Sequence, residues 1–274
     1  MTTRAILFLC IDFKSEKDTL DLYRDIRAQT VAQNITFSIV CNSGSDDVNK
    51  LFSSEARDNL IIEDASDNIG YLPSANRSIL AYLSTNPTPD YIVVSNADIR
   101  IFDERFFEHL LSGERALSAV VAPKIVTLDG VSQNPFMRSR PALPRILFLE
   151  LIFRFWPAFW TYSMLKNIKD YLSSLVKRNR DFSIGKERIH APHGSFMIFP
   201  KYFFESGCKL DHKSFLYGEE LFVGETCRLN GIEVVYNPDL EVLHKEHAVT
   251  SAIGIKKKAG YLAGATSFIR KEFY

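Results

Sequence analysis

Asn96 and Asp98 are the residues of this chain whose types and spacing most clearly suggest chemistry. They follow residues 91–94, four β-prone side chains that predict a buried strand. Open α/β sheets bind ligands at the edge where their parallel strands end. An oxygen ligand at that edge suits a hard divalent cation that accompanies a nucleoside diphosphate. The same residues also fit a strand followed by an ordinary Asx turn.

Four more polar clusters follow apolar segments in the same way. They are Asp12, residues 42–46, residues 67–76, and Glu219 and Glu220 with His244 beyond them. Because the ends of parallel strands meet at one edge of a sheet, these side chains could share a single cleft. The repetition of the pattern is more informative than any one cluster.

The elements that must position these clusters alternate between strands and helices over the first 126 residues. Apolar runs predict strands at residues 5–11, 36–40, 60–62, 91–94 and 119–126, and helical spacing predicts helices at residues 17–29, 74–84 and 104–111. This order predicts an α/β fold with a doubly wound, mostly parallel sheet. Later strands are predicted at residues 195–199, 232–236 and 240–243, and helices at residues 219–229 and 261–274.

Residues 138–190 interrupt this pattern with an aromatic and basic segment that we expect to be helical. The window holds 11 Lys or Arg against 4 Asp or Glu, and residues 145–162 are strongly apolar and aromatic. Glu150, Arg154 and Pro157 keep any uncharged run below the roughly 18 residues that a membrane-spanning helix needs. Two interpretations stay open. The segment is either a buried helical hairpin or an interfacial element whose aromatics lie at headgroup depth, with cations on anionic lipid.

Composition limits the remaining possibilities. At 274 residues and 46% hydrophobic content, the chain can bury a full core as one large domain, or as one domain with an appendage. Its 33 basic and 33 acidic residues balance, which gives no general argument for binding nucleic acid. The four cysteines form no C-x-x-C pair, so neither zinc nor a redox dithiol is indicated. The N-terminus lacks a signal-peptide pattern, so we expect a cytoplasmic protein.

Five motifs resemble those of family 2 glycosyltransferases and occur in the same order. They are N-x-G-x-x-x-x-x-N at Asn68, Gly70 and Asn76; N-A-D at residues 96–98; a small-residue strand start at His193 and Gly194; F-L-Y-G-E-E at residues 215–220 with Arg228 and Gly231; and His244 with Ser251. Each motif is weak alone, and residues 138–190 have the least support. The resemblance is strongest to the bacterial rhamnosyltransferase-like branch.

This resemblance implies a GT-A fold and an inverting reaction with a nucleotide-sugar donor. It implies Asp98 and His244 as ligands of a divalent metal, Mn²⁺ or Mg²⁺, and Glu220 as the general base, with Glu219 as the second candidate. The donor-binding residues would be Asp12, Phe13, Asn42, Asp46, Asn68, Gly70, Asn76 and Asn96, and the acceptor-binding residues His193 and Gly194. Alternatives stay open: a strand-end histidine, a carboxylate pair that complements a helix dipole, and asparagines in turns and caps.

The chain departs from the family pattern at the nucleotide end. Cys41 precedes Asn42 where relatives have Asp, and a thiol cannot replace a carboxylate as acceptor for a base N–H. Asp12 and Phe13 replace a common Thr-Tyr pair, so Asp12 could supply the missing carboxylate. Asn96 stands where many relatives have Asp, and offers the metal a neutral or water-mediated contact. The base of the donor therefore stays open between UDP and dTDP.

We therefore expect one GT-A-like domain over residues 1–274, with a nucleotide-sugar-binding half at 1–126, a helical insertion at 138–190 that is either buried or membrane-associating, and a catalytic, acceptor-binding half at 191–274. The expected activity moves a sugar to a growing, lipid-linked bacterial surface glycan of the lipopolysaccharide or capsule type, at the inner face of the cytoplasmic membrane. One alternative is a non-catalytic relative that binds glycans or partners. Another is a sugar nucleotidyltransferase, although residues 12–16 lack the glycine-rich loop such enzymes carry.

Overall fold

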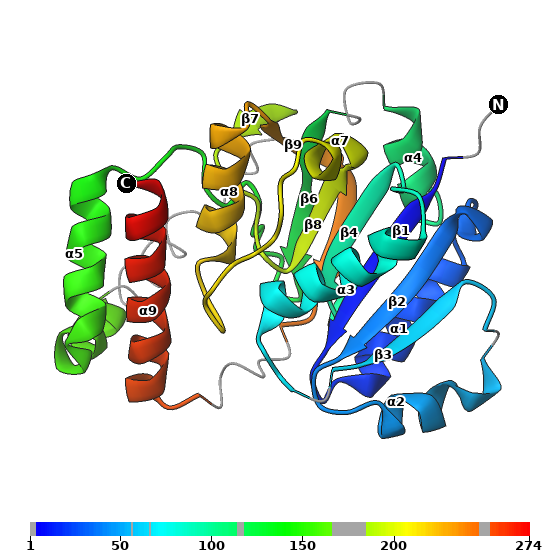
Figure 1. Ribbon diagram of the computed structural model, residues 1–274, viewed down its shortest axis with the longest axis horizontal. Helices are drawn as coiled ribbons and strands as arrows, with labels where there is room; N and C mark the ends of the chain where they lie inside the picture. The colour runs from blue at the N-terminus through cyan, green and yellow to red at the C-terminus, as the bar shows by residue number, and fades with distance from the viewer. Residues whose placement is uncertain (1–3, 56, 66, 114–117, 166–184, 247–252) are drawn as a thin grey trace.

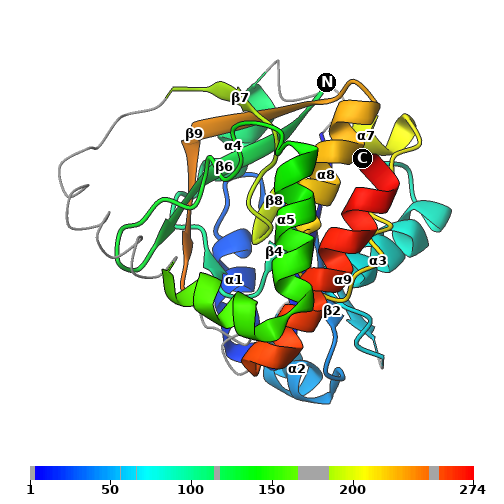
Figure 2. The ribbon, with the colours of Figure 1, turned by 90° about the vertical axis from the view of Figure 1, so that its left-hand side faces the viewer.

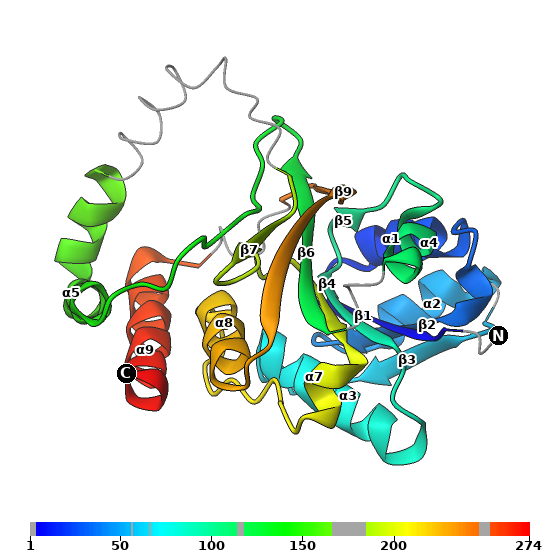
Figure 3. The same ribbon diagram turned by 90° about the horizontal axis from the view of Figure 1, so that it is seen from above.

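The computed structural model describes residues 4–55, 57–65, 67–113, 118–165, 185–246 and 253–274. The described residues form a curled sheet of nine strands, with helices on both faces (Figures 1 and 3). Its order is β3-β2-β1-β4-β8-β6-β9-β5, and β7 pairs with β9 in addition. The expected mixed α/β fold with a mostly parallel sheet is confirmed.

The N-terminal part supplies the parallel strands of the sheet. These are β1 (Ile6–Asp12), β2 (Ile35–Cys41), β3 (Leu60–Asp64) and β4 (Tyr91–Asn96). The helices that connect them are α1 (Glu16–Arg27), α2 (Asp46–Leu51), α3 (Tyr71–Thr85) and, after β4, α4 (Phe106–Ser112), with short 3₁₀ turns η1 (Ala32–Asn34) and η2 (Phe52–Ser54). Every residue of β1 is buried because helices cover both faces of this central strand. The ends of β1, β2 and β4 consequently open at one edge of the sheet.

The C-terminal part adds strands of both directions. Here β8 (Phe196–Pro200) runs antiparallel to β4 and to β6 (Ala119–Thr127), and β9 (Glu233–His244) runs parallel to β6. The two short strands β5 (Ile99–Arg100) and β7 (Glu187–Ile189) pair antiparallel with β9. Two helices, α7 (Lys201–Glu205) and α8 (Glu219–Leu229), cover one face beside α3 (Figure 3).

The strands predicted at 232–236 and 240–243 are one strand, so the prediction of two was wrong. Pro123 pairs with Asn237 and the next residue, Lys124, pairs with Glu241, so the intervening residues form a bulge. A bulge accommodates a proline because the extra residues leave the ladder. The Asn-Pro-Asp sequence therefore marks an irregularity within β9.

The sheet divides the core into two layers. Side chains that alternate along β1 belong to different layers, with Phe8 on one face and Leu7 on the other. The first layer is aromatic: the Phe8 ring stacks on Phe37 with centroids 5.3 Å apart, and α1, η2 and α4 close over it. The second layer is mainly aliphatic and lies under α3, α7 and α8. Burial on both faces sets the strand register, and with it the positions of the strand ends.

Two further helices form a layer outside α8. These are α5 (Leu143–Arg154) and α9 (Ile255–Phe273), which lie side by side (Figure 2). Residues 156–165 form another helical segment after α5. Within the described ranges, no helix is both long enough and apolar enough to cross a membrane. The basic residues at 166–180 lie outside the described residues.

Candidate active site

Strand pairing brings Asp98 against His244. The residue after Asp98 begins β5, and its pairing with β9 places Ile99 opposite His244. His244 Nε2 lies 3.3 Å from Asp98 Oδ1, and both residues are almost buried. The two predicted metal ligands therefore lie together, although nothing in the local sequence around either one predicts that contact.

Gln133 sets the proton position on the His244 ring. Its Nε2 donates to Glu246 Oε1 at 2.6 Å, which turns its Oε1 toward His244 Nδ1 at 2.7 Å. An amide oxygen only accepts, so Nδ1 carries a proton. In the neutral ring the lone pair then resides on Nε2, which faces Asp98. This is the arrangement in which an outer residue prepares a histidine for a cation.

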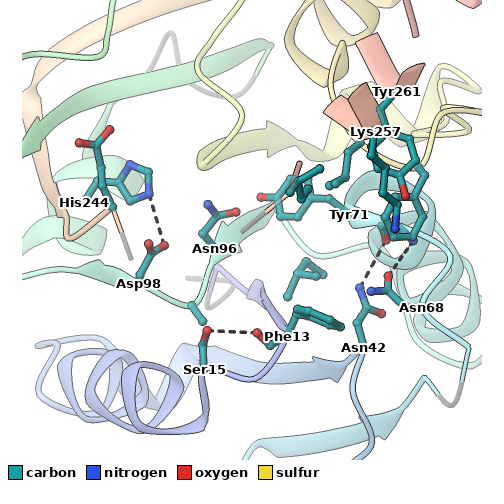
Figure 4. A pocket seen from close by; sticks show the side chains of 17 residues that line it. Phe13, Ser15, Asn42, Asn68, Tyr71, Asn96, Asp98, His244, Lys257 and Tyr261 are labelled. Carbon is teal, nitrogen blue, oxygen red and sulfur yellow. Dashed lines mark hydrogen bonds and ion pairs between the residues drawn. The ribbon is translucent and has the colours of Figure 1, made fainter. Parts of the chain in front are cut away.

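Asp98 and His244 stand at one end of a cleft of about 460 Å³. Seven of the predicted site residues line it: Phe13, Asn42, Asn68, Gly70, Asn96, Asp98 and His244. In Figure 4 the Asp98–His244 pair lies at one end and Asn42 with Asn68 at the other. The expectation that separate polar clusters meet at one sheet edge holds for β1, β2, β4 and β9.

The asparagines at the other end of the cleft hold the turn before α3. Asn68 Oδ1 accepts the Gly70 N–H at 3.1 Å, and Asn42 Oδ1 accepts the Ser74 hydroxyl at 2.8 Å. Gly70 has φ +106°, and a Cβ built there would lie 2.2 Å from the Phe215 carbonyl oxygen. Only glycine fits this close approach. Both asparagine side chains thus support the loop, and for Asn68 this is the role that the turn-and-cap alternative expected.

Three predicted donor-binding residues do not line the cleft. Asp12 is fully buried, and its Oδ2 accepts the Thr19 hydroxyl at 2.5 Å on the α1 side of the sheet. Burial raises the pKa of Asp12. Asp46 is exposed in the first turn of α2, and Asn76 Oδ1 accepts the Leu210 N–H at 3.0 Å. Asp12 is therefore poorly placed to replace the carboxylate missing at Cys41.

Glu219 and Glu220 begin α8 beside the predicted acceptor residues. Gly194 N–H donates to Glu220 Oε1 at 3.3 Å, while Glu219 is buried. Burial raises the pKa of both carboxyls, and the neighbouring charge of Glu220 raises that of Glu219 further. Neither carboxylate lines the cleft. The pair stays in a poorly solvated position next to it.

His193 joins the carboxylate pair to the Asp98–His244 end. Its ring centroid lies 6.0 Å from that of His244. Burial, with a smaller effect of His244, lowers the pKa of His193 to about 4, so the ring is neutral at physiological pH. Because Nδ1 accepts the Ser195 N–H at 3.2 Å, the proton resides on Nε2. Glu220, Gly194 and His193 thus form a group next to the Asp98–His244 pair.

Solved structures share this fold at low sequence identity. A crystal structure of GalNAc-T7 with UDP, GalNAc and Mn²⁺ has a TM-score of 0.57 at 11% identity, over 89% of this chain and 44% of that one. Residues 1–349 of S. aureus TarS in complex with UDP-GlcNAc give 0.55 at 12%, over 96% and 66%. The chain has a GT-A glycosyltransferase fold.

The likeness is one of structure rather than of sequence. No protein-family model matches the chain, and no curated protein sequence matches it. A longer structure of S. aureus TarS gives a TM-score of 0.54 at 13% identity, over 88% of this chain and 36% of that one. The chain spans between 36% and 66% of the length of these three structures. The likeness therefore establishes the GT-A fold.

Tyr71 occupies the GT-A cleft between its two ends. In Figure 4 its hydroxyl points toward Asn96. That oxygen is buried and has no hydrogen-bond partner among the described residues. Burial, followed by the charges of Glu219 and Glu220, raises the Tyr71 pKa well above its ordinary value. The hydroxyl is a candidate donor to a ligand, and Tyr71 connects the cleft with the carboxylate pair.

Sequence reasoning missed several residues of the site. Lys257 and Tyr261, in the first turns of α9, line the cleft opposite Phe13 (Figure 4). A signal existed, because the first turn of α9 holds lysines and no acidic residue, which opposes the helix dipole. Gln133 gave no signal, since it lies in a segment that resembled a loop. Ser251, from the closing motif, lies outside the described residues.

Proposed function

We propose that this protein is an inverting, metal-dependent glycosyltransferase that uses a nucleoside-diphosphate sugar. The observation that carries the proposal is the Asp98–His244 pair at one end of a cleft formed by strand ends. Two of the neighbours were solved with UDP and Mn²⁺ or with UDP-GlcNAc, which supports a nucleotide sugar as donor. The rhamnosyltransferase-like branch stays a prediction from the motifs.

The donor would lie along the cleft with its base near Phe13 and its diphosphate near Asp98. Phe13 offers an aromatic face for a pyrimidine, and Asn68 and Gly70 bring loop backbone close to the ligand. Lys257 lies exposed across the cleft from Phe13 and adds positive charge to the donor site. Both UDP and dTDP fit this account, because the usual carboxylate is replaced by Cys41.

Asp98 and His244 would hold the divalent metal. Their Oδ1 and Nε2 atoms face each other across 3.3 Å, and Gln133 leaves the Nε2 lone pair free for a ligand. Among the described residues, no three His, Cys, Asp or Glu side chains are grouped to hold a metal ion. Asp98 and His244 would therefore suit a divalent cation whose other ligands were water, Asn96 and diphosphate oxygens. When bound, the cation neutralises charge that develops on the leaving diphosphate.

Glu220 would act as the general base. It takes the proton of the acceptor hydroxyl as that oxygen bonds to the anomeric carbon, and the bond from this carbon to the diphosphate oxygen breaks. A carboxyl with a raised pKa suits proton abstraction near neutral pH. Glu220 is favoured over the buried Glu219 because its carboxylate reaches Gly194, beside His193. The acceptor we propose is a growing, lipid-linked bacterial surface glycan at the cytoplasmic membrane.

Calorimetric titration of UDP and dTDP, with and without Mn²⁺, tests the donor site. The proposal predicts binding by the wild type that needs Mn²⁺ and is lost in Asp98→Ala. Nucleotide binding that requires neither Mn²⁺ nor Asp98 would contradict the proposed metal site. No binding of either nucleotide would favour the non-catalytic alternative.

A further inference from the structure

Several large apolar side chains of α5 and of the helical segment that follows it remain exposed. These side chains, which we call the outer face, are Leu147, Phe148, Leu151, Phe155, Trp156 and Trp160. They are 46–69% exposed, although all are large hydrophobic side chains. Figure 3 shows α5 at the end of the molecule remote from β2 and β3. Exposed apolar patches of this kind usually mark a surface that another partner covers.

The exposure does not arise from a misplaced helix, because the inner side of α5 is anchored. Glu150 is buried, and its Oε2 accepts Arg270 Nε of α9 at 2.6 Å. The Arg270 hydrogen bond lowers the Glu150 pKa despite partial burial. Ile146 is also buried. Leu147 and Leu151 are one turn apart and share a side that lies about 100° around the helix from Ile146 and Glu150. A helix that is apolar on two sides is expected to be covered on both.

The basic character of this segment indicates which partner could cover the outer face. In the sequence, residues 138–190 carry 11 basic against 4 acidic side chains, although residues 166–184 lie outside the described residues. On α5 itself Arg145 is exposed, and Arg154 is exposed and pairs with Glu150. A second copy of this chain would bring the same positive excess against itself. An anionic lipid surface is complementary, because aromatic and aliphatic side chains enter the interface while cations meet the headgroups. The outer face also carries two tryptophans, which favour the membrane–water interface.

The outer face is connected to the cleft through α9. This helix packs against α5, and its first turns contribute Lys257 and Tyr261 to the cleft. Figures 1 and 2 place residues 156–165 beside the N-terminal half of α9. We infer that the outer face docks on the surface of an anionic bilayer and holds the cleft next to it. Delivery of a lipid-linked acceptor to the cleft rests on the proposed function, whereas docking does not.

Vesicle flotation of the full chain tests the inference. We expect the wild type to float with mixed phosphatidylcholine–phosphatidylglycerol vesicles, and to float less with phosphatidylcholine alone or at high salt. Leu151→Glu and Trp160→Glu should each lower the bound fraction about tenfold, because each puts a charge at the apolar interface. Leu229→Glu, at a 60% exposed leucine on α8, is the matched control and should float like the wild type.

Three results would overturn the inference. The first is a wild type that stays in the soluble fraction. The second is a Leu151→Glu variant that floats as the wild type does. The third is a wild-type dimer in light scattering that Leu151→Glu dissociates, because a second copy would then cover the face. UDP titration of the same samples separates the two proposals: a wild type that binds UDP and does not float contradicts only the docking inference.

Discussion

The two ends of the cleft use polar side chains in different ways. At one end Asn42 and Asn68 accept hydrogen bonds from residues of the turn before α3 and of its first helical turn, so a ligand there would contact ordered backbone. At the other end Asp98 Oδ1 and His244 Nε2 face each other across 3.3 Å, and both residues line the cleft. Polar residues that follow strands thus support a loop at the asparagine end, whereas Asp98 and His244 face each other at the other end.

The largest effect is expected from Asp98→Ala. Loss of the carboxylate removes half of the protein's contribution to the metal site, while the asparagine end stays intact. Removal of one such electrostatic group costs roughly 10²–10³ in turnover in other enzymes. Steady-state rates with Mn²⁺ and a donor sugar measure it. An Asp98→Ala enzyme whose turnover rate stays within about threefold of the wild-type rate would contradict the role assigned to Asp98.

Gly70→Ala should damage the asparagine end by a backbone effect. The new Cβ would meet the Phe215 carbonyl oxygen at 2.2 Å, in a conformation with φ +106°. We expect donor affinity to fall by about tenfold or more, together with a lower melting temperature, since strain of about 1–3 kcal/mol must be accommodated. Gly44→Ala is the control: φ is +94° there too, but a Cβ meets nothing within 4 Å. Equal losses in both variants would show that φ alone matters.

Gln133→Leu should weaken metal binding without removing a ligand. The His244 ring would lose the acceptor that holds its proton on Nδ1. Loss of such an outer partner typically costs about 10–100-fold in metal affinity. The measurement is Mn²⁺ dependence of UDP binding, compared with His244→Ala. Gln133→Glu keeps an acceptor toward Nδ1 and should retain more affinity than Gln133→Leu, so the reverse order would reject the positioning role.

The smallest effect concerns stability, and its sign depends on pH. The pKa of Glu219 is raised in the folded protein, so its favourable contribution exists at low pH and is lost as pH rises through that pKa. Glu219→Gln should therefore raise the melting temperature at pH 9 by about 3 °C or more, with no gain at pH 4. Thermal scans across this range measure it.

Glu225→Gln provides the opposite control. Burial alone would raise the Glu225 pKa, but hydrogen bonds from Arg140 and Arg228 lower it overall. A lowered pKa contributes stability above the unfolded value that is lost as pH falls. Glu225→Gln should therefore destabilise the protein at neutral pH and less so at acid pH. Similar pH trends in the two variants would contradict the assigned environments.

The sequence predicted the strands and the edge at which they end, because apolar periodicity and burial are local properties. It did not predict the contact of Asp98 with His244, which depends on the pairing of two-residue β5 with the end of β9. It also could not orient Asp12, since a strand-end residue turns toward either face, and Thr19 on α1 captures this one. Gln133 was missed because a non-local return along β6 brings it to His244.

Turnover by the wild type and Glu220→Gln tests the central claim most directly. UDP- and dTDP-sugars with Mn²⁺ would be followed for release of nucleoside diphosphate, across pH. The account predicts a wild-type rate that rises with pH through the raised carboxyl pKa, and at least about a hundredfold loss in Glu220→Gln with nucleotide binding retained. A Glu220→Gln enzyme as active as the wild type, or a wild type that binds nucleotide and never turns over a donor, would contradict it.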